Sequence, residues 1–590
     1  MPSKVVYVDF RGGMIDSRMR RRTDLQGYYN SASLIENAVP TRAGGLKLRP
    51  GLARFSSVIG AERIIPFTKS VDESFIVALA DKSLQMYGVG TDGMLKLLDE
   101  RSIRTEYEKA DIPDIQFSQN YERIVLAHKK HKPFTLQYKD GGISYGELEL
   151  DEVANTYRVD GKEERVGYEY SELLKTDGDY PSCVAFMSQR LWLMSTANKP
   201  YKLWASRPFE FNDFQTEDLI QSVQEGTTTE QYLKAIKGSS TTTEDLPNGT
   251  AEYPSARKRK TEIKVSADGY YTKTVTYYDA EGSVLASNTD ATSYTTPVYG
   301  WESIAREDCA MELETSSDRD EKVQWIGYAG NGLYVGTASS EWIIPIDASA
   351  INASITKIGS YGSAEYQCVY GANSIFYLQS GRKRIRAINI VSDGVSFSEP
   401  SYQCESVLKA GIKEMHWQRV PEPRLYCVLY DGSIAVLSYD SDYGINAWCI
   451  WKFPAHRILS MSIMDTSEGQ VPVVLAETDT KFKYLYRLDE NALSDDGEPF
   501  KATVVTNNIE GDGTIPYTKK VSNIYVDSYR TEFRAKSNTG ASLTPRDFDK
   551  DLIKMDVYSS STFDGMKMTI ESVEGKPFEI LAIAVELEVS

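Results

Sequence analysis

The chain has 590 residues, with 66 Lys or Arg against 84 Asp or Glu, which gives a net charge of −18 at pH 7. A chain of this length predicts about four domains, although a propeller or a sandwich takes up more residues in one unit. The acidic balance argues against a protein that binds nucleic acid over its whole surface, because such proteins present a basic face. It is compatible with a conduit for DNA, since an acidic wall repels the phosphate backbone and lets the strand pass.

The composition favours a β-rich protein. Aromatic residues make up 11% of the sequence, 38 residues are tyrosine, and few windows keep a helical period beyond three turns. The first ten residues lack the layout of a signal peptide, and no apolar run reaches the roughly eighteen residues of a membrane span. We therefore expect synthesis and folding in a host cytoplasm. The cysteines are spaced far apart without a C-x-x-C pair, so we expect reduced core residues: Cys183, Cys309, Cys368, Cys404, Cys427 and Cys449.

The first patterned stretch is residues 10–55. The pairs Gly12-Gly13 and Gly44-Gly45 predict turns, and apolar residues spaced by three or four between positions 28 and 38 predict a short amphipathic helix. Residues 1–54 hold ten Lys or Arg and four Asp or Glu, a charge of +6, so the other 536 residues carry −24. A basic end on an acidic chain suggests a docking surface for an acidic partner, and the alternative is a solvated run of charges.

A unit of three short apolar strands then recurs along the chain. The clearest units start at residues 323, 368, 414 and 458, which are 45, 46 and 44 residues apart. This period is typical of the blades of a β-propeller, which take roughly 40 to 50 residues each. Looser units near residues 63–87, 115–127 and 183–205 raise the number of predicted blades to about seven.

Two segments interrupt the period, and the last part of the chain leaves it. We expect an insert over residues 139–180 and a larger inserted β-rich domain over residues 215–322, because inserts with strands of their own often carry binding functions. We therefore expect the chain to divide into an N-terminal platform segment (1–60), first propeller blades (61–214), the inserted domain (215–322), remaining blades (323–500) and a C-terminal β platform domain (501–590). The fold class is therefore mainly β: a propeller, an inserted β domain, and a separate platform built from the N- and C-terminal regions.

Short motifs in the N-terminal segment resemble the tail tubular protein B family of short-tailed bacteriophages, which forms the hexameric nozzle at the distal end of the tail tube. The family opens with a Gly-Gly turn, an "Arg, any, Asp-Leu" step, a "Leu-any-Asn" helix and an "Arg-Pro-Gly" exit. This chain has Ile35 where the helix motif has Leu. The matching residues are Arg11-Gly12-Gly13, Arg22-Thr23-Asp24-Leu25, Ile35-Glu36-Asn37 and Arg49-Pro50-Gly51.

The resemblance continues through most of the chain but leaves the region near 215–300 unmatched. One departure is Lys132-Pro133, where the family often has two prolines. The similar segments are Gln116-Phe117-Ser118-Gln119, Val125-Leu126-Ala127-His128, Gln189-Arg190-Leu191, residues 200–214, residues 333–342, Tyr361-Gly362-Ser363, Ala447-Trp448 and Lys576-Pro577-Phe578.

The resemblance implies a structural virion protein of the phage tail, made in the host bacterial cytoplasm. As a nozzle subunit it would form a ring of copies, a hexamer, dock onto the adaptor or gatekeeper ring, hold tail fibres or spikes, and pass viral DNA transiently through its lumen without sequence-specific binding. The inserted domain would be a fibre dock or a tip. We expect contacts between subunits or with the adaptor from Arg20, Arg21, Arg22, Arg42 and Arg49, each of which could instead form a salt bridge within the chain.

The sequence contains little that is typical of catalysis, and we predict no catalytic, cofactor or metal site. His128 and His131 form an H-x-x-H pair whose rings we expect on opposite faces of a strand and turn, which disfavours zinc. Ser144 lies in a G-x-S-x-G pattern that a nucleophile elbow would need between a strand and a helix, but a turn precedes it and a charged strand follows. The pair Asp440 and Asp442 could serve glycosidase chemistry, although a solvated loop is the default.

An alternative function is a β-propeller tail protein that binds or degrades glycans. Five tryptophans inside or beside the predicted blades could form a sugar platform, or they could pack between blades: Trp325, Trp342, Trp417, Trp448 and Trp451. The sparse acid and base residues and the matched family segments favour the nozzle.

Overall fold

The computed structural model describes residues 3–19, 22, 24–25, 27–90, 93–98, 102–151, 154–159, 162–167, 173–223, 239–265, 270–293, 299–315, 321–392, 394–441, 443–467, 469–510, 519–529, 531–540, 542–546, 548–558 and 565–589. The chain is mainly β and divides into two compact units. The first unit comprises Met1–Asp151, Tyr170–Phe214 and Ala310–Ser590, and the second comprises Glu152–Glu169 and Gln215–Cys309. In the described residues, no helix has the length and apolarity of a membrane span.

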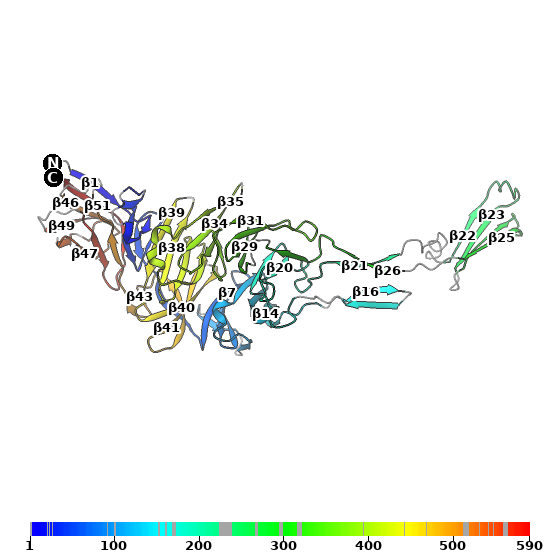
Figure 1. Cartoon of the computed structure of the whole chain (residues 1–590), viewed down its shortest axis with the longest axis horizontal. Helices are drawn as coiled ribbons and strands as arrows, with labels where there is room; N and C mark the ends of the chain where they lie inside the picture. The colour runs from blue at the N-terminus through cyan, green and yellow to red at the C-terminus, as the bar shows by residue number, and fades with distance from the viewer. Residues whose placement is uncertain are drawn as a thin grey trace. The chain divides into compact units, whose positions relative to one another are not determined.

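Seven antiparallel sheets, the blades of a β-propeller, follow one another in the described part of the first unit (Figure 1). Blade one contains β7 (Ala61–Thr68), β8 (Ser74–Ala80), β9 (Ser83–Val89) and β10 (Leu95–Leu97), with β11 (Ile103–Arg104) also paired to β9. Blade two contains β12 (Gln116–Asn120), β13 (Arg123–His128), β14 (His131–Lys139) and β15 (Gly142–Glu147). Blade three contains β18 (Cys183–Met187), β19 (Arg190–Met194), β20 (Lys202–Ala205) and β27 (Met311–Glu314).

Blades four to seven account for most of the second half of the chain. Blade four contains β28 (Val323–Ala329), β29 (Gly332–Thr337), β30 (Glu341–Pro345) and β31 (Thr356–Gly359), and blade five contains β32 (Val369–Gly371), β33 (Ser374–Leu378), β34 (Ile385–Val391) and β35 (Gly394–Ser398). Blade six contains β36 (Ile412–Gln418), β37 (Arg424–Leu429), β38 (Ile434–Asp440) and β39 (Ile445–Trp451). Blade seven contains β40 (His456–Thr466), β41 (Gly469–Thr478) and β42 (Lys483–Asp489). The fourth strand of blade seven is β6 (Gly51–Ser57), which comes from the N-terminal segment and pairs with β42. The prediction of about seven blades is confirmed.

Hydrogen bonds made by residues in or just before the first strand of each blade join neighbouring blades and close the ring. The contacts in order are Gln119 with Thr68, the Phe186 amide with Ser118 Oγ (3.2 Å), Cys183 Sγ with the Val323 carbonyl (4.0 Å), Cys368 Sγ with the Ile326 carbonyl (3.7 Å), the Met415 amide with Tyr366 Oη (2.9 Å), Ser460 Oγ with Glu414 Oε2 (2.8 Å), and the Ile64 amide with Ser460 Oγ (3.0 Å). The last contact brings blade seven back to blade one. All six cysteines are buried, and none forms a disulfide bond.

The blade strands form because their residues suit burial on both faces. Every residue of β8, β29, β33 and β37 is buried, and these strands are rich in β-branched and aromatic residues. Apolar clusters fill the space between neighbouring blades, so each sheet is covered by the sheets beside it.

The platform combines the two ends of the chain in one sheet that continues from blade six. Its C-terminal strands are β45 (Thr503–Thr506), β46 (Lys519–Ser528), β47 (Phe533–Ser537), β48 (Ser542–Pro545), β49 (Leu552–Tyr558), β50 (Met568–Ser572) and β51 (Glu579–Val589). The N-terminal strands β1 (Ser3–Val8) and β5 (Leu46–Leu48) pair antiparallel with β51, and β4 (Ala38–Pro40) pairs with β5. Figure 1 accordingly draws the N- and C-termini side by side.

Residues 31–36 form a strand where the sequence predicted a helix. After a single turn, η2 (Tyr28–Asn30), the chain enters β3 (Ser31–Glu36), which pairs parallel with β2 (Gly13–Met14) and β39 and antiparallel with β45. The helical spacing of its apolar residues is overridden because both edges of the strand find partners. The remaining short elements of this unit are η1 (Ser17–Met19), η3 (Ile112–Asp114), η4 (Tyr402–Leu408), β43 (Ser494–Asp495) and β44 (Glu498–Pro499).

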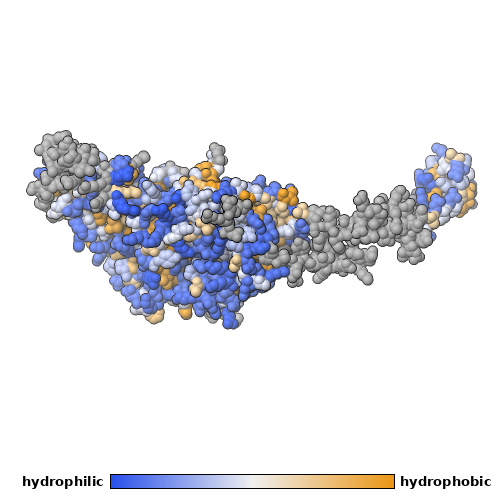
Figure 2. Space-filling view, viewed as in Figure 1, coloured by the Kyte–Doolittle hydropathy of each residue, from blue (hydrophilic) through white to orange (hydrophobic). Residues whose placement is uncertain are grey.

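In the described part of the second unit, the strands form two antiparallel pairs and a meander. The pairs are β16 (Ala154–Val159) with β17 (Lys162–Gly167), and β21 (Asp218–Val223) with β26 (Tyr299–Ile304). The meander consists of β22 (Ser240–Asp245), β23 (Lys258–Val265), β24 (Tyr270–Tyr278) and β25 (Val284–Ser293) in that order. Figure 2 shows hydrophobic and hydrophilic residues side by side on the surface of this meander.

Both inserts are shorter than the sequence predicted. Strand β15 belongs to blade two, so the first insert begins after it rather than at residue 139. Strand β27 pairs with β20, which places the larger insert between two neighbouring strands of blade three and ends it before residue 311. Short, polar outer strands such as β15 and β27 lack the apolar pattern that marks the inner strands.

Candidate functional site

The five arginines predicted to make contacts between subunits lie in different environments. Arg20 and Arg21 fall outside the described residues. Arg22 is exposed and pairs with Asp24 at 2.8 Å. Arg42 is also exposed, forms a salt bridge with Asp440, and lies over the Tyr443 ring at 5.5 Å. Both arginines therefore remain on the surface. Solvent screens the Arg22–Asp24 pair, so this pair contributes little, whereas the carboxylate that holds Arg42 is buried.

Arg49 is buried, which corrects the prediction that it contacts another subunit. Its side chain has no exposed area and binds Asp495 through both terminal nitrogens, at 2.9 and 2.6 Å. The guanidinium also donates to Asn37 Oδ1 and lies between the Phe453 and Phe500 rings, at 4.2 and 3.6 Å. It takes the intrachain alternative because Asp495, Asn37, two backbone carbonyls and the two aromatic rings surround it. The "Arg-Pro-Gly" exit thus fixes the N-terminal segment to the end of blade seven.

A polar groove lies beside the exposed arginines. It has a volume of about 510 Å³ and is bounded on one side by Arg11, Gly12 and Tyr28 and on the other by Gln403 and Tyr443. Gly13 has a φ of 63°, and a Cβ at this position would lie 2.3 Å from the Trp448 amide nitrogen. The Gly-Gly turn is therefore required for the close contact between this segment and β39.

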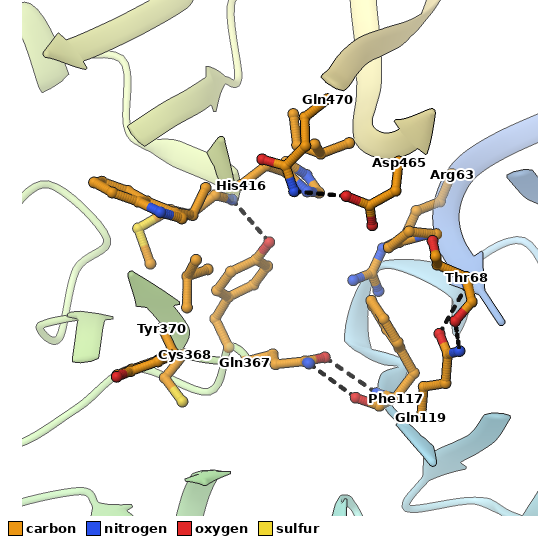
Figure 3. A pocket seen from close by; sticks show the side chains of 16 residues that line it. Arg63, Thr68, Phe117, Gln119, Gln367, Cys368, Tyr370, His416, Asp465 and Gln470 are labelled. Atoms are coloured by element: carbon orange, nitrogen blue, oxygen red, sulfur yellow. Dashed lines mark hydrogen bonds between the residues drawn. The ribbon is translucent and has the colours of Figure 1, made fainter. Parts of the chain in front are cut away.

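A second cavity, which we call the axial cavity, lies inside the ring formed by the first strands of the blades (Figure 3). Its volume is about 370 Å³, and β7, β12, β32, β36 and β40 contribute to its lining. Glutamine side chains in the lining join different blades: Gln367, just before β32, exchanges two hydrogen bonds with the backbone of Phe117 in β12, at 3.1 and 2.8 Å, and Gln119 bonds both the amide and the carbonyl of Thr68. These amides hold the inner wall of the ring together.

A buried charged group underlies one side of this cavity. Arg63 Nη1 donates to the carbonyls of Ile112 and Ile115, at 3.2 and 2.6 Å, while Arg63 Nε lies 3.8 Å from Glu414 Oε1. Burial alone would raise the pKa of Glu414, but its hydrogen bond with His416 and the Arg63 charge outweigh burial, so the pKa is lowered. Glu414 is therefore an anion that balances Arg63. Arg63 was not predicted as a site residue from the sequence, although a charged residue in the apolar stretch 61–67 is a usable signal.

His128 and His131 lie together, which corrects the expectation of rings on opposite faces. They pair directly across the two-residue turn between β13 and β14, and their rings stack with centroids 5.3 Å apart. Residues paired across such a turn share one face of the sheet, whereas residues three apart within a strand do not. Asp111 completes a group whose ligand atoms lie within 4.8 Å of one another.

This group is satisfied by the chain itself. Asp111 accepts hydrogen bonds from Lys130 Nζ at 2.7 Å, and its other oxygen lies 2.9 Å from His131 Nε2. The Lys130 amide donates to His128 Nδ1 at 3.4 Å, which places the proton of a neutral ring on Nε2, toward Asp111. Burial raises the pKa of Asp111, but these hydrogen bonds outweigh it and lower the pKa overall. We interpret the group as an ion-pair network that secures the connection between blades one and two.

The other sequence candidates have structural positions. Ser144 lies inside β15, so its G-x-S-x-G pattern is not at a strand-to-helix turn. Asp440 holds Arg42, and Asp442 lies outside the described residues. Four of the five tryptophans are buried in the blades, whereas Trp417 is partly exposed and lines the axial cavity: Trp325, Trp342, Trp448 and Trp451 are the buried ones.

No protein-family model matches the chain, and no curated protein sequence matches it significantly. Solved structures with some likeness include BBS1N in complex with ARL6DN (9% identity, 75% of this chain and 99% of that chain, TM-score 0.34). Others are the Cps50 (Swd1) β-propeller domain of Myceliophthora thermophila (9%, 74% and 99%, 0.35) and Saccharomyces cerevisiae Sqt1 (7%, 78% and 100%, 0.32). These low scores carry no functional argument, and the strand pairing itself defines the propeller.

Proposed function

We propose that this chain is a subunit of the tail nozzle of a short-tailed bacteriophage. It forms a ring of copies, docks onto the adaptor above it, carries fibres or spikes at its side, and conducts the genome during ejection. Its mechanism is the formation and opening of interfaces, with no bond chemistry.

The observation that carries this proposal is the structural role of the motif-bearing segment, residues 10–55. Its strands pair with blade six through β2 and β3, complete blade seven through β6, and join the C-terminal strands through β5. A segment that connects all these parts within one chain has a fixed geometry. It can therefore present its exposed side chains to a partner with little loss of conformational entropy on binding.

The exposed arginines of this segment support docking onto an acidic partner. The side chains of Arg18, Arg22 and Arg42 are 72%, 58% and 53% exposed, and each pairs with a carboxylate of the same chain. Arg22 and Asp24 are both exposed, so Arg22 can exchange its carboxylate for that of a partner at small cost, whereas Arg18 and Arg42 keep their buried carboxylates and present the exposed part of their guanidinium groups. The groove beside them offers space for a segment of the adaptor.

The outer strand of the platform supports contact between copies. Strand β1 pairs with β51 and with no other strand in the described part of the chain. Its residues alternate, so that Val6 and Val8 are buried while Val5 and Tyr7 are 48% and 72% exposed. An edge strand with exposed apolar side chains is prone to pair with another chain, and a neighbouring copy in a ring would cover it.

Charge reversal at two arginines tests the adaptor interface. We expect the double variant Arg22→Glu, Arg42→Glu to bind the cognate adaptor complex about tenfold more weakly, because both charges then repel an acidic surface. The binding constant can be measured by biolayer interferometry with the adaptor complex immobilised. The matched control is Arg54→Glu, Arg487→Glu.

The control pairs reproduce the local chemistry of the test pairs. Arg487 binds Asp489 two residues along the chain, as Arg22 binds Asp24. Arg54 forms a long-range pair and lies over a tyrosine ring, as Arg42 does. Equal loss of adaptor binding in both double variants would contradict the assignment of the docking surface to the region around Arg22 and Arg42.

A further inference from the structure

The axial cavity of the propeller contains a donor and an acceptor that the chain leaves unused. Arg63 is only 4% exposed, and Figure 3 shows its guanidinium pointing from β7 into the cavity. Nη1 is occupied by two backbone carbonyls, and Nε forms no hydrogen bond. Among the described residues, Nη2 has no hydrogen-bond partner. Nε is the buried donor left without a hydrogen bond, which is costly, whereas Nη2 is accessible, so that a ligand or water can accept from it.

Asp465 is the unused acceptor. Its Oδ1 accepts from Gln470 Nε2 at 2.9 Å, whereas within the described ranges nothing donates to Oδ2 and no cation lies within ion-pair distance. The carboxylate lies on the same side of the cavity as the Arg63 guanidinium (Figure 3). Since Gln119 and Gln367 are already occupied with backbone groups, Arg63 and Asp465 are charged groups of the lining that can hold a ligand.

The balance of charge favours an uncharged ligand. Arg63 is already compensated by the ionised Glu414, and Asp465 adds a further negative charge at the wall. A bound anion would therefore be repelled by Asp465, and a bare cation has no acceptor to offer the unpartnered nitrogens of Arg63. A hydroxyl-bearing ligand can accept from Arg63 and donate to Asp465 at once.

The remaining wall is aromatic and of suitable size. Phe117 and Trp417 line the cavity, and Tyr370, which is 45% exposed, stands at its rim, so the cavity is open to solvent. A volume of 370 Å³ falls within the roughly 300–1,000 Å³ of small-molecule sites. Flat aromatic surfaces beside a few oriented polar groups suit a ligand with both apolar C–H faces and hydroxyl groups.

We propose that this cavity binds an uncharged saccharide unit, with Arg63 and Asp465 holding its hydroxyls and Phe117 and Trp417 contacting its C–H faces. The inference goes beyond the proposed nozzle function and does not depend on it, because every group of the site belongs to one copy of the chain. The same chemistry fits a free sugar and the terminal unit of a surface polysaccharide.

Saturation-transfer NMR on the full-length protein tests the site. The probes are glucose, galactose and N-acetylglucosamine as uncharged sugars, glucuronate and inorganic phosphate as anions, and linear oligosaccharides of the uncharged sugars. We expect transfer to at least one uncharged sugar and an affinity at least about tenfold lower in Asp465→Asn, which removes the acceptor charge but keeps the bond to Gln470. If the oligosaccharide displaces the free sugar, the ligand is the terminal unit of a polysaccharide. If the oligosaccharide does not displace it, the ligand is a free sugar.

Two further variants keep the result interpretable. Asp479→Asn changes an exposed carboxylate elsewhere on blade seven and should bind like the unaltered protein. Val369→Phe adds volume inside the cavity and should abolish binding while the thermal unfolding midpoint shows that the protein is folded. The proposal is overturned if no uncharged sugar shows transfer, if Asp465→Asn and Val369→Phe bind as the unaltered protein does, or if glucuronate or phosphate binds more tightly than every uncharged sugar.

Discussion

The blades of the propeller and the meander of the inserted unit use the same strand order, but their burial is opposite. In blade four, Trp325 and Tyr334 are fully buried. In the meander, none of the side chains that the structure describes in β22 to β25 is buried, and Val284 is 58% exposed. Strand pairing thus defines both sheets, whereas only the blades gain the apolar burial that stabilises a β-sheet in water. We expect the propeller to determine the stability of the chain and the meander to be locally weak and available for contacts.

The largest expected effect is in the propeller core. Trp325 packs against Tyr377, with ring centroids 5.2 Å apart, and against the backbone of Gly336. We expect Trp325→Ala to lower the free energy of unfolding by about 3–5 kcal/mol, because a large cavity forms between blades four and five. Urea unfolding followed by tryptophan fluorescence measures this loss. A change smaller than that of a surface substitution would contradict the packing between blades.

Burial should also make Arg49 more important for stability than Arg42, although both lie in the N-terminal segment. Arg49→Ala leaves the Asp495 carboxylate buried without its partner, and we expect a loss of about 3–5 kcal/mol in the same unfolding measurement. Arg42→Ala removes a partner that is itself half exposed from the buried carboxylate of Asp440, and we expect it to lower the free energy of unfolding by clearly less than Arg49→Ala does. Equal effects of the two substitutions would show that burial does not decide their roles.

The propeller should also have a pH dependence that the meander lacks. Burial lowers the pKa of His128 from 6.5 to about 4. Between these values the unfolded chain binds the proton more readily than the folded chain does, so stability is fully present above pH 6.5 and is lost as the pH falls toward 4. We expect a loss of up to about 3 kcal/mol over this range. Asp111 adds nothing here, because its lowered pKa acts only below its ordinary value of 3.8.

The matched variant for this dependence is His128→Gln, which should flatten the stability profile between pH 6.5 and 4. The free energy of unfolding at several pH values provides the measurement. A profile as steep as that of the unaltered protein would show that another group is responsible.

The smallest expected effect is in the meander. Tyr277 stacks on Tyr253 with centroids 4.8 Å apart, and Tyr277→Ala should cost about 1 kcal/mol locally. Hydrogen exchange of the β23 and β24 amides should become faster, while the main unfolding transition stays where it is. A shift of the main transition would contradict the independence of the two regions.

The sequence predicted the blades well because the inner strands have a clear apolar pattern at a regular period. Outer strands such as β31 and β27 were missed because they are short and partly exposed. The role of β6 depends on pairing with β42, more than 400 residues away, and no local pattern encodes such a partner. The strand β3 was predicted as a helix for the same reason, since its pairing partners lie in blade six and the platform.

The candidate sites were harder to predict than the fold. Arg49 and Arg42 are both arginines in one basic segment, and only the positions of Phe453, Phe500 and Asp495 determine which of them is buried. The axial cavity brings Arg63 and Asp465 together from blades one and seven, so neither residue is informative until the ring is closed. Charged residues in apolar first strands are the one local signal for such a site.

The measurement that tests the central claim most directly is the mass of the purified protein in solution, alone and mixed with its cognate adaptor complex. Mass photometry resolves single copies, rings and ring-bearing adaptors in one experiment. We expect the protein alone to remain monomeric and to close into a ring, six copies by the resemblance, when the adaptor is present. A protein that remains a monomer and does not bind the adaptor would contradict the nozzle assignment.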